Sequence, residues 1–283
     1  MADIERAPKY GFEWTVDDLK AYNIGIDVVD ESTFFGAAGS GAAVPSIDGV
    51  LDKNPNIPAS IVENTKEPEQ MEYEDHATRQ FFQFLGNLNA GTADDTKYAD
   101  EFGVFLLNLM NYNTEGREIH TKKEIEYISC GEQKKALVDV CMTDMQPVED
   151  YVRFLQVNKK SSKDLSDVAI HAASASLIAG AVAAFSLNHR LLQSASSRPD
   201  GIVFPGLTVI GSVPIFFKIP VTQDLVMAVN TGHYPSEPTN VQIIIPTAAV
   251  TEETGKVKLQ LDLSDLEMRR NAFRYLEAMK TFL

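Results

Sequence analysis

Two charged side chains near the middle of the chain could take part in metal-dependent chemistry. Asp139 lies in an apolar strand-like run, where a carboxylate is costly to bury unless it is paired or binds a metal ion. Lys159 ends the next strand-like run. Metal-dependent hydrolysis of a phosphodiester needs carboxylates that hold Mg²⁺ and a cation near the attacked phosphate. Asp139 and Lys159 are therefore candidate catalytic residues, and Asp139 is a candidate ligand of Mg²⁺ or Mn²⁺.

The position that would complete such a site is occupied by Val157, which cannot coordinate a metal ion. Residues two apart on a strand share a face, so Val157 and Lys159 should point the same way, toward Asp139. Gln156 is expected on the opposite face and is a third candidate for a remnant site. If the site is active, Glu101 on the preceding predicted helix could supply an additional metal-binding acid.

Each candidate also has a purely structural explanation. Asp139 could pair with Lys159 across a hairpin, as a partly buried ion pair with a small net effect on stability. Lys159 could equally be a solvated lysine at a strand end. Gln156 is better explained as a hydrogen-bonding residue of the sheet than as a catalytic group.

Hydrophobic periodicity predicts the order helix, helix, three strands, helix, strand around these residues. The helices are predicted over residues 74–86, 94–112 and 167–193. The strands are predicted over residues 117–121 with a continuation at 126–128, over 135–143, over 151–159, and within a β-rich segment at 207–218. This order predicts an α/β fold with a mixed central sheet flanked by helices.

The two ends of the chain are predicted to add to this core. Residues 1–70 are expected to form an N-terminal arm with an extended loop, and residues 71–283 a single α/β domain. Within that domain the core spans about 94–220 and a C-terminal cap spans 221–283. The smaller predicted elements are a helix at 16–22, a strand at 24–29, a loop at 36–58, strands at 241–245 and 257–261, and a final helix whose capping box pairs Ser264 with Glu267.

Composition limits the classes of partner. The formal net charge of −15 disfavours nucleic acid, because affinity for phosphate backbones comes mainly from Lys and Arg. The charge is uneven: residues 61–101 are strongly acidic, whereas residues 151–200 carry a basic surplus, where any anionic ligand should bind. A protein or a small molecule is the expected partner.

The weakly polar run at 172–187 is shorter than a membrane span and is expected to belong to a helix buried in protein. The N-terminus lacks the features of a secretory signal, so a cytoplasmic or nuclear protein without membrane contact is expected. Cys130 and Cys141 have no zinc-binding spacing, and the five histidines form no metal motif. No cofactor is expected beyond Mg²⁺ or Mn²⁺ in an active site.

Several runs of the sequence together resemble uncharacterised fungal proteins related to the PD-(D/E)XK nuclease superfamily. They are residues 21–24, 34–36, 128–132, 138–141, 155–156, 158–159, 178–185, 188–190, 204–208, 214–222 and 232–235, which extend over most of the chain. The resemblance implies a restriction-endonuclease-like core. In these relatives the third strand reads Gln-Glu-Asp-Lys, which implies a catalytic Glu at the position of Val157 and an Asp at that of Asn158.

The resemblance therefore implies a degenerate active site. We expect a non-catalytic binding or interaction protein on a nuclease-like scaffold. The alternative is a Mg²⁺-dependent nuclease that uses Asp139 and Lys159, with Glu101 as an additional acid.

Overall fold

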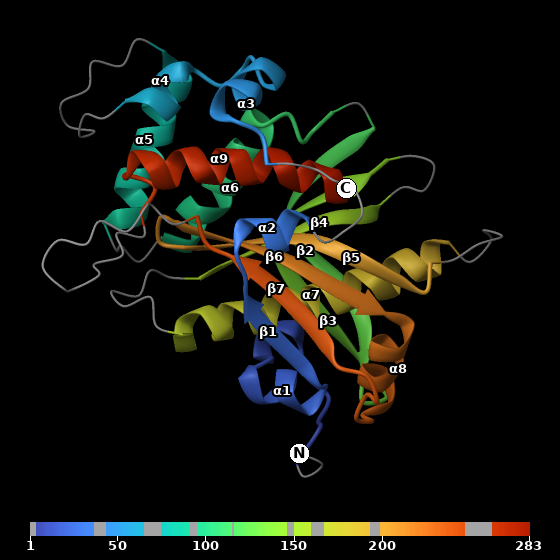
Figure 1. Cartoon of the computed structure of the whole chain (residues 1–283). Coiled ribbons are helices and arrows are strands. Elements are labelled where there is room, and N and C mark those ends of the chain that lie inside the picture. Colours follow the sequence, from blue (N-terminus) through green and yellow to red (C-terminus); the bar gives the residue numbers. More distant parts are fainter. Residues whose placement is uncertain are drawn as a thin grey trace, which may run out of the picture.

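A mixed β-sheet lies at the centre of the protein, with helices on both of its faces (Figure 1). The structure, a computed structural model, describes residues 4–36, 44–64, 75–90, 95–114, 116–145, 150–159, 167–192, 199–246 and 262–283. The strands are β1 (Ile24–Val28), β2 (Arg117–Ser129), β3 (Glu132–Asp144), β4 (Tyr151–Lys159), β5 (Gly201–Ile210), β6 (Val213–Thr222) and β7 (Thr239–Ile244). The α/β class and the mixed central sheet are as predicted.

Helices precede, separate and follow these strands. They are η1 (Gly11–Glu13), α1 (Val16–Ala21), α2 (Glu31–Gly36), α3 (Ile47–Lys53), α4 (Ala59–Glu63), α5 (His76–Asn89), α6 (Asp95–Leu109), α7 (Asp167–Leu191), α8 (Gln223–Thr231), α9 (Leu266–Met279) and η3 (Lys280–Phe282). The predicted long helices and strands agree with this list to within a few residues. Helices α2, α3, α4 and α8 were not predicted.

The strand order across the sheet is β1-β7-β6-β5-β4-β3-β2. β1 pairs with β7 and β4 pairs with β5 in parallel, whereas the other neighbours are antiparallel. The two predicted pieces at 117–121 and 126–128 belong to the single strand β2. The predicted segment 207–218 is divided between β5 and β6 at Gly211, whose φ of +60° permits the tight turn. The predicted strand at 257–261 lies outside the described residues.

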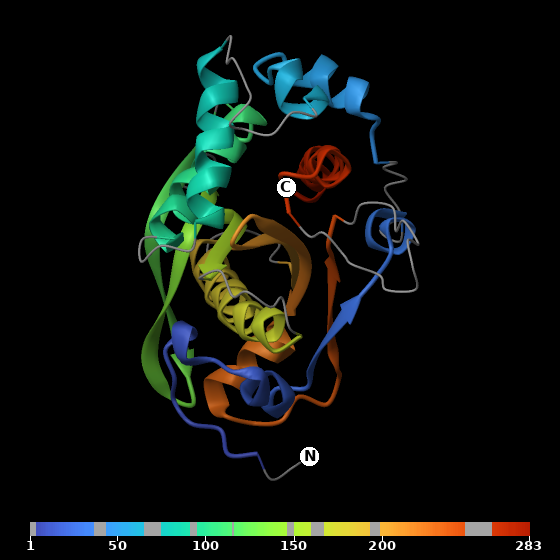
Figure 2. The ribbon, with the colours of Figure 1, turned by 90° about the vertical axis from the view of Figure 1, so that its left-hand side faces the viewer.

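One face of the sheet curves around helix α7, which lies in the hollow of the sheet (Figure 2). Its small side chains are buried against β2, β3, β4 and β5, in what we call the α7-side core. The segment Ile170–Leu191 is long and apolar enough to cross a membrane, with a mean hydropathy of 1.7, but 78% of its most apolar window is buried inside the protein. The prediction that residues 172–187 belong to a helix buried in protein is confirmed for its central part.

The other face of the sheet is covered by α5, α6 and α9 (Figures 1 and 2), which form what we call the α6-side core. Aromatic rings join these helices: Phe81 of α5 lies 5.6 Å from Phe102 of α6 and 5.9 Å from Phe273 of α9, between ring centroids. The short helices α3 and α4 pack against α9. The predicted loop at 36–58 therefore contains a helix, and part of the first seventy residues belongs to this core.

Helix α9 begins one residue later than the predicted capping box requires. The N-cap is Asp265, whose Oδ1 accepts a hydrogen bond from the backbone amide of Met268 at 2.8 Å. Ser264, the predicted cap, lies outside the helix, where its hydroxyl accepts a long 3.4 Å hydrogen bond from Asn89. The prediction was wrong by one residue because Ser264 and Asp265 are both good capping residues, and the sequence alone does not choose between them.

This difference gives a stability test. Asp265→Ala should lower the free energy of unfolding by about 1 kcal/mol, because it leaves a backbone amide of the first turn without its acceptor. Ser264→Ala, the matched control one residue away, should cost less than about 0.5 kcal/mol. Urea unfolding followed by circular dichroism measures both. Equal losses, or a larger loss for Ser264→Ala, would place the cap at Ser264 after all.

Candidate functional site

At Asp139, the side chains of strand β3 switch from one face of the sheet to the other. Val138 packs in the α7-side core, whereas Val140 packs in the α6-side core. Residues two apart in a regular strand share a face, so the alternation must break between them. The backbone pairing of β3 with β4 also ends at Val140. Beyond that point the backbone amide of Asn158 donates to Asp139 Oδ2 at 2.7 Å, so a carboxylate takes the place of a backbone carbonyl.

Strand β2 changes face at the residue opposite Asp139. Ile119 packs with the α6-side core, whereas Ile125 is part of the α7-side core. Between them, Lys122 has a φ of +52°, a left-handed conformation that is rare for a residue with a Cβ atom. The register of β2 against β3 skips Lys122 and Asp139, which lie between the pairs Thr121–Val140 and Lys123–Val138 and therefore opposite each other. The two strands therefore change face together, and both charged side chains turn toward helix α6.

Five side chains from four elements meet there, and we call them the polar cluster: Asp100 of α6, Lys122 of β2, Asp139 of β3, and Gln156 and Asn158 of β4. Lys122 Nζ lies 2.6 Å from Asp139 Oδ1 and 2.7 Å from Asp100 Oδ2. Asn158 Nδ2 donates to Asp100 Oδ1 at 2.8 Å. Gln156 Nε2 donates to Asn158 Oδ1 at 2.9 Å. The cluster links α6 to three neighbouring strands.

The Lys122 ammonium binds two carboxylates in the polar cluster. The side chains of Asp100 and Asp139 are only 10% and 14% exposed, whereas that of Lys122 is 51% exposed. Burial raises the pKa of Asp100, and the hydrogen bonds from Lys122 and Asn158 oppose the rise. Burial alone would lower the pKa of Lys122, but its hydrogen bonds to Asp100 and Asp139 outweigh this effect and raise the pKa. Lys122 therefore stays charged.

The predicted pair of Asp139 with Lys159 is wrong, since Asp139 pairs with Lys122. Lys159 Nζ donates to Ser176 Oγ of α7 at 3.3 Å. Val157 is 4% exposed and packs in the α7-side core. Val157 and Lys159 share a face, as predicted, but it is the face covered by α7. The change of face at Asp139 directs that carboxylate to the other side, so the expected triad of Asp139, position 157 and Lys159 does not converge.

Gln156 and Asn158 occupy the face of β4 that meets the polar cluster. The expectation that Gln156 faces away from the site was therefore wrong. The prediction that Gln156 is a hydrogen-bonding residue within the sheet agrees with its complete burial and its bond to Asn158. Its Oε1 has no hydrogen-bond partner among the described residues.

Glu101 does not reach Asp139. Its side chain is 49% exposed and lies 3.8 Å from Lys97 Nζ. The acid that α6 directs to the sheet is its neighbour Asp100. Successive residues of an α-helix are rotated by about 100°, so only one of the two can face β3. The prediction named the correct helix and the wrong residue.

Asp100, Lys122 and Asn158 were not predicted as members of one cluster. A signal existed for Lys122: the alternating pattern of β2 fails between residues 121 and 126, where a change of face would interrupt it. The signal for Asp100 was its position beside Glu101. For Asn158, the resemblance indicated the position but not the direction of its side chain.

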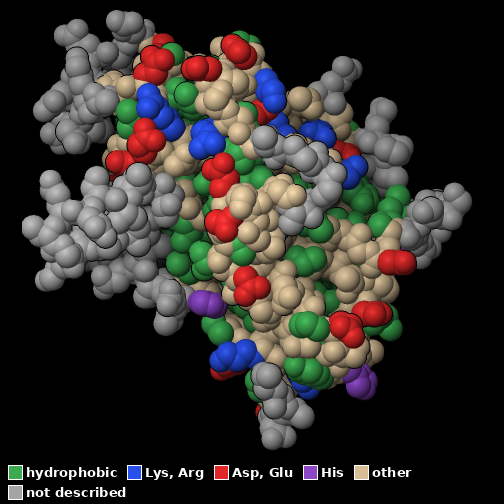
Figure 3. All heavy atoms as spheres, viewed as in Figure 1, with side chains coloured by type: hydrophobic (Ala, Val, Ile, Leu, Met, Phe, Trp, Pro, Cys, Tyr) green, Lys and Arg blue, Asp and Glu red, His purple; other side chains and the backbone are tan. Residues whose placement is uncertain are grey.

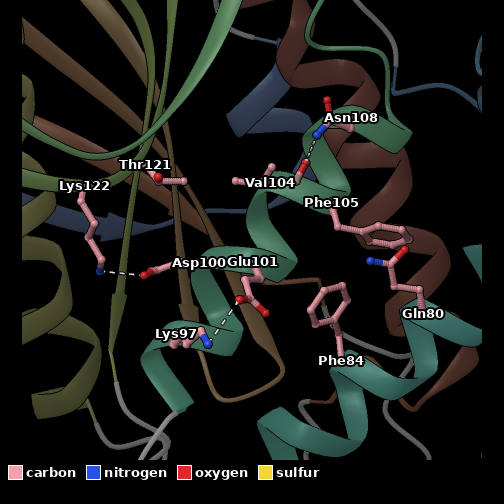
Figure 4. A pocket seen from close by; sticks show the side chains of 10 residues that line it. All are labelled: Gln80, Phe84, Lys97, Asp100, Glu101, Val104, Phe105, Asn108, Thr121 and Lys122. Atoms are coloured by element: carbon pink, nitrogen blue, oxygen red, sulfur yellow. Dashed lines mark hydrogen bonds and ion pairs between the residues drawn. The ribbon is translucent and has the colours of Figure 1, made fainter.

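A pocket of about 570 Å³ opens beside the polar cluster, between α5, α6 and β2 (Figure 4). Its lining residues are Gln80, Phe84, Lys97, Asp100, Glu101, Val104, Phe105, Asn108, Thr121 and Lys122. Figure 4 shows the rings of Phe84 and Phe105 on one side and the Lys122–Asp100 contact on the other. The pocket therefore has an apolar side and a charged side.

The arrangement does not fit a Mg²⁺ or Mn²⁺ ion. Among the residues that the structure describes, no group of three or more His, Cys, Asp or Glu side chains gathers as a ligand set. The two carboxylates that do approach each other both bind the Lys122 ammonium, which occupies the position between them. A cation at that position would have to displace Lys122.

Comparison with known proteins adds no functional information. No protein-family model matches the sequence, and no curated protein matches it. The geometry of the polar cluster and the pocket is therefore the basis for the proposed function.

The close packing of α6 on Gln156 can be tested at Gly103. A Cβ atom at Gly103 would overlap the Gln156 side-chain amide, so Gly103→Ala must displace that amide and break its bond to Asn158. We expect a loss of about 1–2 kcal/mol in the free energy of unfolding. Gly86→Ala on α5 meets nothing within 4 Å and should instead stabilise the protein by up to about 1 kcal/mol. Chemical denaturation distinguishes the two. A stabilising Gly103→Ala would contradict the described position of Gln156.

Proposed function

We propose that this protein is a non-catalytic binding protein on a PD-(D/E)XK-like core, with its binding site in the pocket beside the polar cluster. The observation that carries the proposal is the position of the Lys122 ammonium, 2.6 and 2.7 Å from two carboxylates that would otherwise be available to a metal ion. A protein lysine in that position makes the carboxylates unavailable for Mg²⁺ and leaves no means of activating water by a metal.

The order of elements supports a PD-(D/E)XK-like core. Helix α6 is followed by the antiparallel strands β2, β3 and β4, then by α7, and then by β5, which pairs in parallel with β4. This is the helix, three strands, helix, strand order that the hydrophobic periodicity predicts. Asp139 lies where β3 and β4 separate, and α6 contributes a second acid.

The neutral residues on β4 support a degenerate site. Gln156 and Asn158 are two apart and share the face of the polar cluster, so they hold the positions that an acid and a lysine would need to occupy beside Asp139. Both are amides without charge. The residue beside Asp139 is therefore position 156, where the resemblance also gives Gln, and not the predicted position 157.

The surface charge favours a partner other than nucleic acid. On the face shown in Figure 3, Lys and Arg side chains over the upper helices lie among Asp and Glu side chains. The net charge of −15 adds a general repulsion for phosphate backbones. The rival function, a Mg²⁺-dependent nuclease, also needs Asp139, Lys159 and Glu101 in one place, whereas each has a different partner.

The pocket supports a small-molecule partner. Its volume of about 570 Å³ lies within the range of about 300–1,000 Å³ that small-molecule sites occupy. The combination of aromatic side chains with a few fixed charged groups is also typical of such sites. Helices and a strand, rather than loops, supply the residues that line it, so the pocket is largely preformed.

A metal titration tests the blocked site. The wild-type melting temperature should not change with millimolar Mg²⁺ or Mn²⁺, because no ligand set is free. The double variant Lys122→Met/Gln156→Glu removes the blocking ammonium and adds a third carboxylate beside Asp100 and Asp139. Its melting temperature should rise with Mn²⁺, by the equivalent of about 2.7 kcal/mol at a hundredfold excess over Kd.

The matched control moves the new acid by one residue. Lys122→Met/Val157→Glu puts the carboxylate in the α7-side core, so it should lose several kcal/mol of stability and gain nothing from Mn²⁺. A clear Mn²⁺ shift in the wild type would refute the proposal that the site is blocked. A Mn²⁺ response of the Val157→Glu variant, and not of the Gln156→Glu variant, would show that β4 presents the opposite face to the site.

A further inference from the structure

The apolar side of the pocket consists of rings that helix packing holds in place. Phe84 of α5 and Phe105 of α6 lie 5.6 Å apart between ring centroids, inclined at 48°. Phe84 also lies 5.7 Å from Phe102, which is fully buried. Both pocket rings are only partly buried, so each presents a surface to the pocket. A flat or compact apolar group can pack there without a rearrangement of the helices.

The charged side of the pocket is lined by two carboxylates, Asp100 and Glu101, and two ammonium groups, Lys97 and Lys122. Asp100 and Asp139, the latter behind Lys122, share one ammonium. The remaining pair, Glu101 with Lys97, is loose at 3.8 Å, and both side chains are about half exposed or more, which gives it little strength. With Asp139, which binds Lys122 but does not line the pocket, three carboxylates share two ammonium groups. Glu101 can turn to a ligand at small cost.

This distribution of charge selects for a cation. An anionic ligand at Lys122 would have to draw that ammonium away from Asp100 and Asp139, which is strongly unfavourable, and an anionic ligand at Lys97 would lie beside Glu101. A cationic ligand instead compensates the unbalanced negative charge, and it can also lie against the electron-rich faces of Phe84 and Phe105. The overall charge of −15 attracts cations to the protein at long range.

We propose that the pocket between α5, α6 and β2 binds a small hydrophobic amine, with its apolar group against the rings of Phe84 and Phe105 and its ammonium at Glu101. This proposal rests on the proposed binding function and names the ligand class for the same site.

Three probes of nearly equal size test the charge preference: phenethylamine, phenethyl alcohol and phenylacetate. Binding to the full chain is measured by ligand-observed NMR and by calorimetry. Phenethylamine should bind on the order of tenfold more tightly than the alcohol, which corresponds to one cation–π or ion-pair contact, and phenylacetate should bind most weakly. Equal binding of the three probes, tighter binding of phenylacetate, or no binding of the amine at about 10 mM would overturn the proposal.

Variants locate the two parts of the ligand. Glu101→Gln should reduce the affinity for phenethylamine about fivefold to tenfold and leave that for the alcohol unchanged, because it removes only the charge. Phe84→Ala should weaken both probes. Lys97→Met should strengthen the amine, because it removes a competing cation. If Glu101→Gln retains full amine affinity, the proposed position of the ammonium is wrong. Melting curves verify that each variant is folded.

The metal titration separates this inference from the proposed function. If the wild type binds Mn²⁺, the blocked site is refuted, whichever probe binds. If the wild type ignores Mn²⁺ and the amine has no preference over the alcohol, only the ligand class is wrong.

Discussion

The Lys122 ammonium between two poorly exposed carboxylates is the interaction on which the rest of the site depends. It lies at the level where β2 and β3 both turn their side chains from the α7-side core to the α6-side core. A carboxylate at that level needs a partner, since an unpaired charge with so little exposure is very costly. Lys122 meets this need for both acids, and its left-handed backbone is the local strain that accompanies the turn of its side chain.

The same interaction connects stability with function. Helix α6 is attached to the sheet through Asp100, and the other side of that helix forms one wall of the pocket. Replacing such an ion pair with well-packed apolar groups is often neutral or favourable, whereas removing one partner costs about 3–5 kcal/mol. The polar cluster therefore fixes the position of α6 and the charged groups beside the pocket, and it contributes little net stability. In the proposed function, the Lys122 ammonium blocks a metal ion from the two carboxylates.

The prediction of secondary structure succeeded where the periodicity was long and regular. The predicted helices corresponding to α5, α6 and α7 and the strands corresponding to β3 and β4 agree with the structure to within a few residues, because the burial of one face imposes the pattern on the sequence. The short helices α2, α3 and α4 were missed because elements of one or two turns leave too little periodicity, and their stability comes from packing against α9 and the sheet. The predicted N-cap of α9 was wrong by one residue because adjacent Ser and Asp residues can both cap a helix, and the local sequence does not choose between them.

The sequence by itself determined that a carboxylate stands in an apolar strand, that the residues of β4 include no acid able to join it, and that an acid must come from the preceding helix if one is present. Only the tertiary structure decided which way these side chains point. Strand alternation is a local rule, and it predicts a shared face only while the strand is regular. The break at Lys122 and Asp139 reverses the face to which the Asp139 side chain points, so the β4 residues beside it are Gln156 and Asn158 and not Val157 and Lys159. On α6, the acid that faces the sheet is Asp100 and not Glu101, because successive helical residues point in different directions. A shift of the side-chain alternation by one residue cannot be recognised from composition or spacing, because both faces of this sheet are buried and both carry apolar residues.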